Sequence, residues 1–223
     1  MAAATVGVVF DLDGVLVDSG EAHRRAWQRL GDEVGTPFSD ALFARTFGQR
    51  NADIVPAWLG NVAPDRADAL GARKEALYRD LVRAGEARAY PRVPGVLAAL
   101  RAGGARLAVA SSGPRENVAL LVDRLGVAGL LDAVVSSEDV RRGKPDPEPF
   151  LRAAERLGVV PVRCAVVEDA VHGVEAARRA GMLAIAVLTS TPRDALAAAG
   201  AELFVGEVGD LDVGDLLARL AAR

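Results

Sequence analysis

Aromatic residues and cysteine are both scarce in this chain of 223 residues. Phe, Trp and Tyr make up only 4% of it, so a hydrophobic core must be built mainly from Ala, Val and Leu. The single cysteine, Cys164, cannot form an internal disulfide, which is typical of proteins from reducing compartments. A chain of this length can bury roughly 70% of its unfolded surface, so it needs neither a disulfide nor a structural metal to fold.

The sequence also lacks the features of nucleic-acid-binding and membrane proteins. It has 27 basic and 30 acidic residues, a net charge of −3 and no Lys/Arg block, so we expect no nucleic-acid partner. No stretch approaches the roughly 18 apolar residues needed to cross a bilayer, so we expect no membrane partner. Residues 1–10 are apolar, but they carry no basic segment and lead directly into Asp11, unlike a signal peptide. We therefore expect a cytoplasmic protein, and a monomer.

Short, continuous apolar runs alternate with helical patterns along most of the chain. The runs lie at residues 6–10, 106–110, 133–135, 164–167, 183–188 and 203–205. Helical patterns lie at residues 96–101, 115–125, 149–157, 173–180, 194–199 and 211–220, with Gly or Pro at several junctions. Continuous apolar runs indicate strands buried on both faces. The order therefore predicts an α/β fold, a doubly wound parallel sheet with helices on both faces.

The interval from about residue 20 to residue 89 breaks this alternation. It reads as helical throughout, with apolar residues at helical spacing in 22–30 and 67–82, and it is more polar than the rest. We interpret it as a helical module inserted into one loop of the sheet domain. The predicted domains are a Rossmann-like core of residues 1–18 and 90–223 and an inserted α-helical domain of residues 19–89.

Two carboxylates, Asp11 and Asp13, directly follow the first predicted strand. Open α/β sheets bind ligands at the carboxyl ends of their strands, and the two-residue spacing places both acids on one side. A calcium loop of the EF-hand type needs an oxygen ligand and a Glu where this chain has Val15 and Ala22. A solvated turn does not explain why two acids end a fully apolar strand, so we interpret them as functional.

A hydroxyl motif ends the second predicted strand, where Ser111 is followed by Ser112 and Gly113. A hydroxyl followed by free backbone N–H groups at a helix start suits a phosphate oxygen. A nucleophile elbow is excluded because it requires Gly where Val109 stands. An ordinary helix N-cap remains an alternative for this motif on its own.

A lysine lies in a rigid, proline-rich segment further along the chain. Pro145 and its neighbours fix an extended backbone, which points Lys144 in one direction. A P-loop is excluded, because Pro145 replaces its Ser/Thr and Glu138 its leading Gly. Taken alone, Lys144 could equally be a surface lysine.

A second pair of acids, Glu168 and Asp169, ends the predicted strand at residues 164–167. Hard oxygen ligands of this kind suit Mg²⁺, which binds one or two carboxylates, several waters and a substrate phosphate.

In this order the motifs resemble the haloacid dehalogenase superfamily, specifically its phosphatase and β-phosphoglucomutase-like branch, over essentially the whole chain. The resemblance implies that Asp11 is the nucleophile, that Asp13 is the general acid and base, and that Ser111 and Lys144 hold the phosphate. It further implies a Mg²⁺ cofactor, with the ligands Asp11, Glu168, Asp169 and the backbone carbonyl of Asp13. The helical insert is similar to the cap domain of that branch, which points to His23 beside Asp13, to Arg50 and Lys74, and to Ser112 of the core as substrate contacts.

The resemblance implies a Mg²⁺-dependent phosphatase that hydrolyses a small phosphate monoester, such as a sugar phosphate, through an aspartyl phosphate. Dehalogenases of the superfamily have no acid at the position of Asp13. The alternative is a β-phosphoglucomutase-type mutase, which needs donors for a second phosphate. Pro114 offers none, although Arg115 and Asn117 could compensate. A non-catalytic phosphate-binding module is disfavoured, because such a module should have lost one of the catalytic positions.

Overall fold

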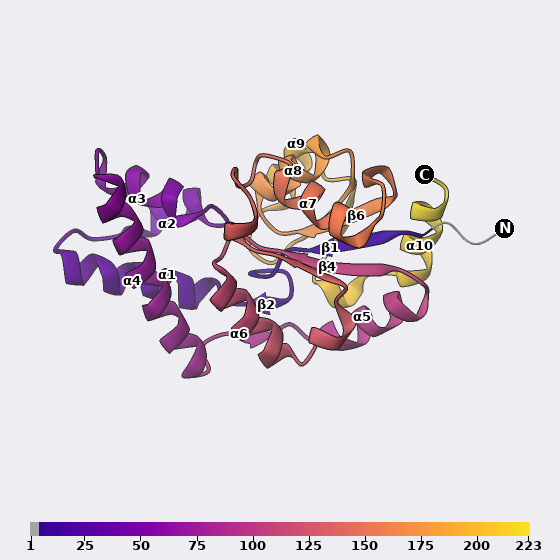
Figure 1. The fold of residues 1–223 in the computed structure, drawn as a ribbon, viewed down its shortest axis with the longest axis horizontal. Coiled ribbons are helices and arrows are strands. Elements are labelled where there is room, and N and C mark those ends of the chain that lie inside the picture. Colours follow the sequence, from indigo (N-terminus) through magenta and orange to yellow (C-terminus); the bar gives the residue numbers. More distant parts are fainter. Residues whose placement is uncertain (1–4) are drawn as a thin grey trace.

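A six-stranded parallel sheet forms the centre of the computed structural model, which describes residues 5–223 (Figure 1). Its strand order is β5-β4-β1-β6-β7-β8, and every neighbouring pair is parallel. The strands are β1 (Gly7–Phe10), β4 (Arg106–Ala110), β5 (Ala133–Val135), β6 (Cys164–Glu168), β7 (Leu183–Val187) and β8 (Leu203–Val205). The chain enters at the middle of the sheet and builds outward in both directions, so the strand order reverses beside β1.

Helices cover both faces of this sheet, which confirms the predicted α/β fold. The helices are α5 (Val93–Ala102), α6 (Arg115–Leu125), α7 (Glu148–Leu157), α8 (Val171–Arg179), α9 (Arg193–Ala199) and α10 (Val213–Ala221). Successive residues of β1 point to opposite faces. Val8 and Phe10 pack in the hydrophobic cluster of α5, α6 and α10, whereas Val9 packs in the cluster of α7, α8 and α9. Residues buried on both faces explain why these strands read as continuous apolar runs.

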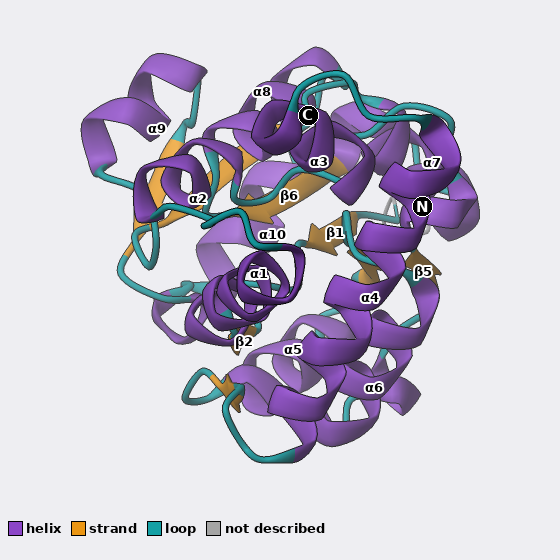
Figure 2. Ribbon diagram, turned by 90° about the vertical axis from the view of Figure 1, so that its left-hand side faces the viewer, coloured by secondary structure: helices purple, strands orange, loops and turns teal. Residues whose placement is uncertain are grey.

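Four helices lie together beyond one end of the sheet (Figures 1 and 2). They are α1 (Gly20–Val34), α2 (Asp40–Thr46), α3 (Asn51–Leu59) and α4 (Pro64–Arg83), and we call them the helical segment. Both α1 and α3 pack on α4. An aromatic cluster fills the interior, where Trp27 stacks on Phe38 at 4.8 Å between ring centroids and meets Trp58 edge-on at 6.0 Å.

The chain leaves and re-enters the sheet domain through two short strands, β2 (Val17–Asp18) and β3 (Arg88–Ala89), which pair in antiparallel fashion. The expectation that the interval is helical throughout is therefore wrong at its end, because a strand of two residues is too short to show a periodicity. None of the helices in the described part of the chain is long and apolar enough to cross a membrane. Residues 1–4, part of the apolar stretch at the N-terminus, lie outside the described residues.

Candidate active site

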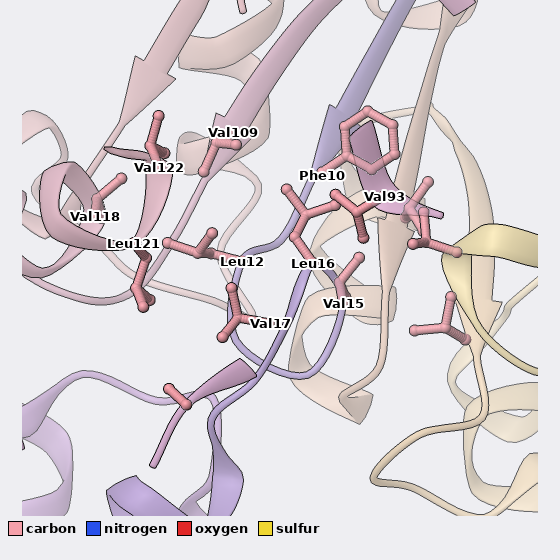
Figure 3. Packing of buried hydrophobic residues seen from close by; sticks show 14 of the residues in the cluster. Phe10, Leu12, Val15, Leu16, Val17, Val93, Val109, Val118, Leu121 and Val122 are labelled. Carbon is pink, nitrogen blue, oxygen red and sulfur yellow. The ribbon is translucent and has the colours of Figure 1, made fainter. Parts of the chain in front are cut away.

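The two acids after β1 are directed by the apolar residues around them. Leu12, between Asp11 and Asp13, is 1% exposed and packs in the cluster of Phe10 and Leu121 (Figure 3). The backbone N–H of Asp11 donates to the Val167 carbonyl at 3.0 Å, so the chain still follows β6 at this point. With Leu12 in the core, both carboxylates point away from it, into one cavity at the carboxyl end of β1.

Lys144 reaches the first of these acids. Its Nζ lies 2.5 Å from Asp11 Oδ1 and 2.5 Å from Glu168 Oε1, and the residue is only 5% exposed. Lys144 is therefore not a surface lysine. Burial raises the pKa of Asp11 to about 7, although the positive charge of Lys144 opposes this rise and the negative charge of Glu168 adds to it.

The two acids after β6 are held differently from one another. Glu168 is fixed by Lys144 through one oxygen and by the backbone N–H groups of Asp169 and Ala170, at 2.8 and 2.9 Å, through the other. Asp169 accepts a hydrogen bond from Ser190. Burial, and then the charges of Glu168 and Asp11, raise the pKa of Asp169 well above its ordinary value. If all three acids were ionised, Lys144 would balance only one of their charges, so burial and this excess of negative charge together raise the pKa values of Asp11 and Asp169.

Two close approaches depend on glycine. A Cβ atom on Gly14, whose φ is +85°, would lie 2.0 Å from Asp169 Oδ2. A Cβ atom on Gly173, in the first turn of α8, would lie 1.8 Å from Glu168 Oε1. Because glycine has no Cβ atom, Gly14 and Gly173 leave the space that the carboxylates of Asp169 and Glu168 occupy.

The acids suit a small hard cation held by few protein ligands. Among the residues that the structure describes, no group of three or more His, Cys, Asp or Glu side chains has a metal-ligating arrangement. Asp11 Oδ2 and Asp169 Oδ1 accept no hydrogen bond from the described residues, whereas both oxygens of Glu168 are taken. One or two carboxylates completed by waters and a substrate phosphate are the ligand set that Mg²⁺ prefers.

Asp13 accepts hydrogen bonds from side chains of the helical segment and from Ser19, the residue that precedes that segment. Its Oδ1 accepts from Ser19 Oγ at 2.5 Å, Tyr78 OH at 3.0 Å and His23 Nε2 at 3.1 Å. Burial alone would raise the pKa of Asp13, but the interactions with His23 and the hydrogen bonds lower it below its ordinary value. Asp13 is therefore ionised in this arrangement.

The hydrogen-bond network assigns the tautomer of His23. Lys74 Nζ lies 2.7 Å from His23 Nδ1, and an ammonium group can only donate. Nδ1 is thus the acceptor, and the hydrogen on Nε2 is donated to Asp13. The ring is also stacked on Tyr78 at 3.8 Å between centroids. Lys74, His23 and Asp13 form one connected line from the helical segment to the sheet domain.

Most of the sequence-predicted residues meet at one cavity of about 50 Å³. Its lining includes Asp11, Asp13, His23, Lys74, Ser111 and Ser112. Ser111 Oγ accepts the N–H of Gly113 at 3.0 Å, so the predicted hydroxyl motif is a tight turn facing this cavity. The cavity is not lined by Lys144, Glu168 or Asp169, of which Lys144 bonds to Asp11, nor is it lined by Arg50. The guanidinium of Arg50 donates to the carbonyl of Arg141 at 3.0 Å and to Asp53 at 3.3 Å, and Arg50 lines a neighbouring cavity.

Sequence reasoning missed three polar residues of this site. Tyr78 lies one helical turn after Lys74 on α4, so helical spacing could have placed both on one face. Glu75, which follows Lys74, and Ser19, at the start of α1, carry no signal of their own, because their roles depend on contacts between distant parts of the chain.

Comparisons with known proteins identify the family to which this chain belongs. The family model of the haloacid dehalogenase-like hydrolases matches residues 6–181. The validoxylamine A 7'-phosphate phosphatase of Streptomyces hygroscopicus subsp. limoneus is 33% identical over 203 residues, covering 86% of this chain and 89% of its own. The β-phosphoglucomutase of Bacillus subtilis is 31% identical over 211 residues, covering 92% and 90%.

A solved structure is similar in fold. The crystal structure of a β-phosphoglucomutase from Clostridium difficile superposes with a TM-score of 0.86 at 22% identity, covering 98% of this chain and all of that one. A sheet of this topology, acids at the ends of β1 and β6 and the match of the family model over most of the chain lead to one conclusion: the chain belongs to the haloacid dehalogenase-like hydrolase family.

Proposed function

We propose that this protein is a Mg²⁺-dependent phosphatase that hydrolyses a small sugar phosphate through an aspartyl phosphate. The proposal rests on one observation: Asp11 and Asp13 line the same cavity, but their carboxylates have different neighbours. Asp11 is bonded to a buried lysine, while Asp13 is held two residues away by donors of the helical segment. One suits a nucleophile and the other a proton carrier.

The residues around Asp11 would neutralise the incoming phosphate. A phosphate dianion repels a carboxylate, so Lys144 and the hydroxyl of Ser111 must first share its charge. Asp11 and Asp169, together with the backbone carbonyl of Asp13, would hold Mg²⁺, which supplies further charge neutralisation when bound. Glu168, the further predicted Mg²⁺ ligand, accepts from Lys144 through one oxygen and from two backbone N–H groups through the other, so in this arrangement it would act by orienting Lys144. Asp11 Oδ2 accepts no hydrogen bond from the residues that the structure describes and is the oxygen left for attack on phosphorus, while Oδ1, which accepts only from Lys144, has a second lone pair for the metal.

Asp13 would carry the proton in both halves of the reaction. Asp13, which is ionised in this structure, would first take up a proton from solvent; attack by Asp11 then breaks the bond from phosphorus to the ester oxygen, and Asp13 donates this proton to the departing alcohol. The resulting carboxylate then takes a proton from the water that hydrolyses the aspartyl phosphate, which releases phosphate and regenerates both acids. His23, Tyr78 and Ser19 favour the carboxylate form, which suits the hydrolytic half of the reaction.

Two side chains that could supply the donor missing at Pro114, Arg115 and Asn117, already bond to other residues. This favours hydrolysis over mutase activity. Arg115 extends to Asp139 at 3.1 Å, and its backbone N–H donates to Glu138. Asn117 donates to Glu75 at 2.5 Å and accepts from Arg79 at 3.0 Å. The amide of Asn117 is therefore engaged at both its nitrogen and its oxygen, and Arg115 would have to give up or share its exposed ion pair with Asp139 to replace the donor missing at Pro114.

The relatives support a phosphorylated sugar-like substrate. One is named as a validoxylamine A 7'-phosphate phosphatase, another as a phosphorylated carbohydrates phosphatase of Thermotoga maritima. In the proposed division, residues 1–18 and 90–223 form the catalytic core, and residues 19–89 form a cap that closes over the substrate.

The test is an assay of purified protein with p-nitrophenyl phosphate and with β-glucose 1-phosphate, with Mg²⁺ and with EDTA. We expect Mg²⁺-dependent release of inorganic phosphate from both substrates without a bisphosphate activator. A rate that survives EDTA contradicts the metal requirement. Conversion of β-glucose 1-phosphate to glucose 6-phosphate that outruns phosphate release, and is stimulated by the bisphosphate, would instead establish the mutase alternative.

A further inference from the structure

Glu75 on α4 is a buried acid that the mechanism above does not use. It is 5% exposed. It lines both the cavity over Asp11 and Asp13 and the neighbouring cavity, which has a volume of about 520 Å³. Glu75 therefore stands between the reacting groups and the space into which the rest of a substrate would extend.

The carboxylate of Glu75 is held as an anion by three donors. Asn51 Nδ2 at 2.7 Å and Lys74 Nζ at 2.9 Å bond to Oε1, and Asn117 Nδ2 at 2.5 Å bonds to Oε2. Burial alone would raise the pKa of Glu75, but the charge of Lys74 and these hydrogen bonds lower it below its ordinary value. At neutral pH this wall of the cavity therefore contains a fixed negative charge.

The cations nearby are already engaged. Lys74 is paired with Glu75, and Arg79 is held by Glu116 at 3.2 Å and by Asn117. Arg50 is bonded to Asp53 and to a backbone carbonyl. In the walls of these two cavities, as far as the structure describes them, every ammonium and guanidinium group has a protein partner. The carboxylate and ammonium of Glu75 and Lys74 thus present an acceptor and a donor side by side, with no net positive charge.

We propose that Glu75 determines specificity by admitting leaving groups that are uncharged and hydroxyl-bearing, and by excluding substrates with a second phosphate. A sugar hydroxyl can donate to Glu75 and accept from Lys74 or Asn51. A second phosphate dianion has only acceptors to offer, and it would lie beside a buried carboxylate, where like charges repel strongly. The inference rests on the proposed phosphatase function and refines its substrate class.

The experiment compares glucose 6-phosphate with glucose 1,6-bisphosphate as substrates of the wild type and of Glu75→Gln. We expect the wild type to favour the monophosphate in kcat/KM by at least about tenfold. Glutamine keeps the shape but removes the charge, so Glu75→Gln should reduce this preference at least about threefold. The control is Glu33→Gln, which removes an equal charge from an exposed ion pair with Arg73 on the same segment. It should leave the preference unchanged.

The outcomes separate this inference from the proposed function. A wild type that hydrolyses both sugar phosphates equally well, or a preference that Glu75→Gln does not change, overturns the role of Glu75. A wild type that hydrolyses neither sugar phosphate nor p-nitrophenyl phosphate contradicts the phosphatase function itself. If thermal unfolding shows that Glu75→Gln does not fold, two measurements on the wild type test the inference instead. They are its preference for the monophosphate and the inhibition of its p-nitrophenyl phosphate turnover by the bisphosphate. Tight inhibition by the bisphosphate then overturns the inference.

Discussion

At the scale of single residues, Asp11 carries the largest expected effect. Asp11→Asn removes the proposed nucleophile but keeps the shape of the side chain, so the fold should persist while turnover is lost. The measurement is Mg²⁺-dependent hydrolysis of p-nitrophenyl phosphate, with circular dichroism as the check on folding. More than a trace of activity in a folded Asp11→Asn protein would remove Asp11 from the role of nucleophile.

Tyr78 tests how Asp13 is positioned. Tyr78→Phe keeps the ring that stacks on His23 but removes one of the three hydrogen bonds to Asp13. A hydrogen bond contributes about 1 kcal/mol, and a loss of that size in the transition state corresponds to roughly a fivefold lower kcat. KM should change little, because the hydroxyl bonds to Asp13 and not to the substrate.

Tyr90→Phe is the matched control, since Tyr90 does not line the cavity over Asp11. An equal loss of kcat in both variants, or a change in KM alone for Tyr78→Phe, would contradict a positioning role for Tyr78.

At the scale of elements, the approach of α8 to the end of β6 leaves no room for a side chain. In Gly173→Ala the new methyl group would overlap the carboxylate of Glu168, which must then move away from Lys144. We expect a loss of activity of more than about tenfold, because correct placing of charge at the reacting phosphate commonly accounts for factors of this size or larger.

Gly95→Ala is the control for this change. Gly95 lies in α5, and a Cβ there would meet nothing within 4 Å. Its activity should equal that of the wild type. If Gly173→Ala keeps full activity at an unchanged melting temperature, the position of Glu168 does not matter for the reaction.

The sheet was predictable because its strands are continuous apolar runs, fully buried in β1, β6 and β7 and partly buried in the edge strands β5 and β8. The continuous apolar runs at residues 106–110, 133–135 and 203–205 coincide with β4, β5 and β8. The pairing of β2 with β3 was not predictable, because it joins two dipeptides about seventy residues apart in the sequence and depends on how the helical segment folds between them.

The residues of the candidate site also fall into those that local sequence predicted and those that it did not. The acids, Ser111 and Lys144 follow strand ends or a rigid turn, so local sequence indicated where their backbones would lie. Tyr78, Glu75 and Ser19 are brought to the cavity only by the packing of α4 and α1 against each other and over the sheet. Such contacts depend on the angle between helices, which local sequence does not determine.

At the scale of the whole molecule, the helical segment is closed over the sheet. The space above Asp11, between the helical segment and the sheet, is narrow, at about 50 Å³, and it adjoins the larger cavity lined by Glu75. Gln49 Nε2 also lies 2.7 Å from His172 Nε2, which joins the two parts of the chain on another side. We expect the helical segment to move away from the sheet when substrate enters and product leaves.

Locking this contact should stop turnover. A Cβ on Gly48 would lie 3.2 Å from that of Ala170, close to the roughly 3.5–4.5 Å that disulfides span between Cβ atoms, so Gly48→Cys and Ala170→Cys can pair if the backbone at Gly48, whose φ is +84°, relaxes. We expect the oxidised double variant to lose sugar phosphate hydrolysis and a reductant to restore it. The native Cys164 is buried and should not interfere.

Each single cysteine variant is a control for the effect of substitution alone. An oxidised double variant that is fully cross-linked, by thiol titration, and still turns over at its reduced rate would contradict the need for opening.

The pairing of β2 with β3 has a consequence for how such proteins diversify. The chain departs from the sheet domain at Asp18 and returns at Arg88, and these two residues face each other across the short ladder. The residues between them enter and leave the sheet domain at this one strand pair. An exchange, enlargement or loss of the intervening helices would therefore not change the spacing of the strands in the sheet. A change in these helices would therefore alter what the enzyme recognises while the acids after β1 and β6 keep their places, provided that donors to Asp13 such as His23 and Tyr78 are retained.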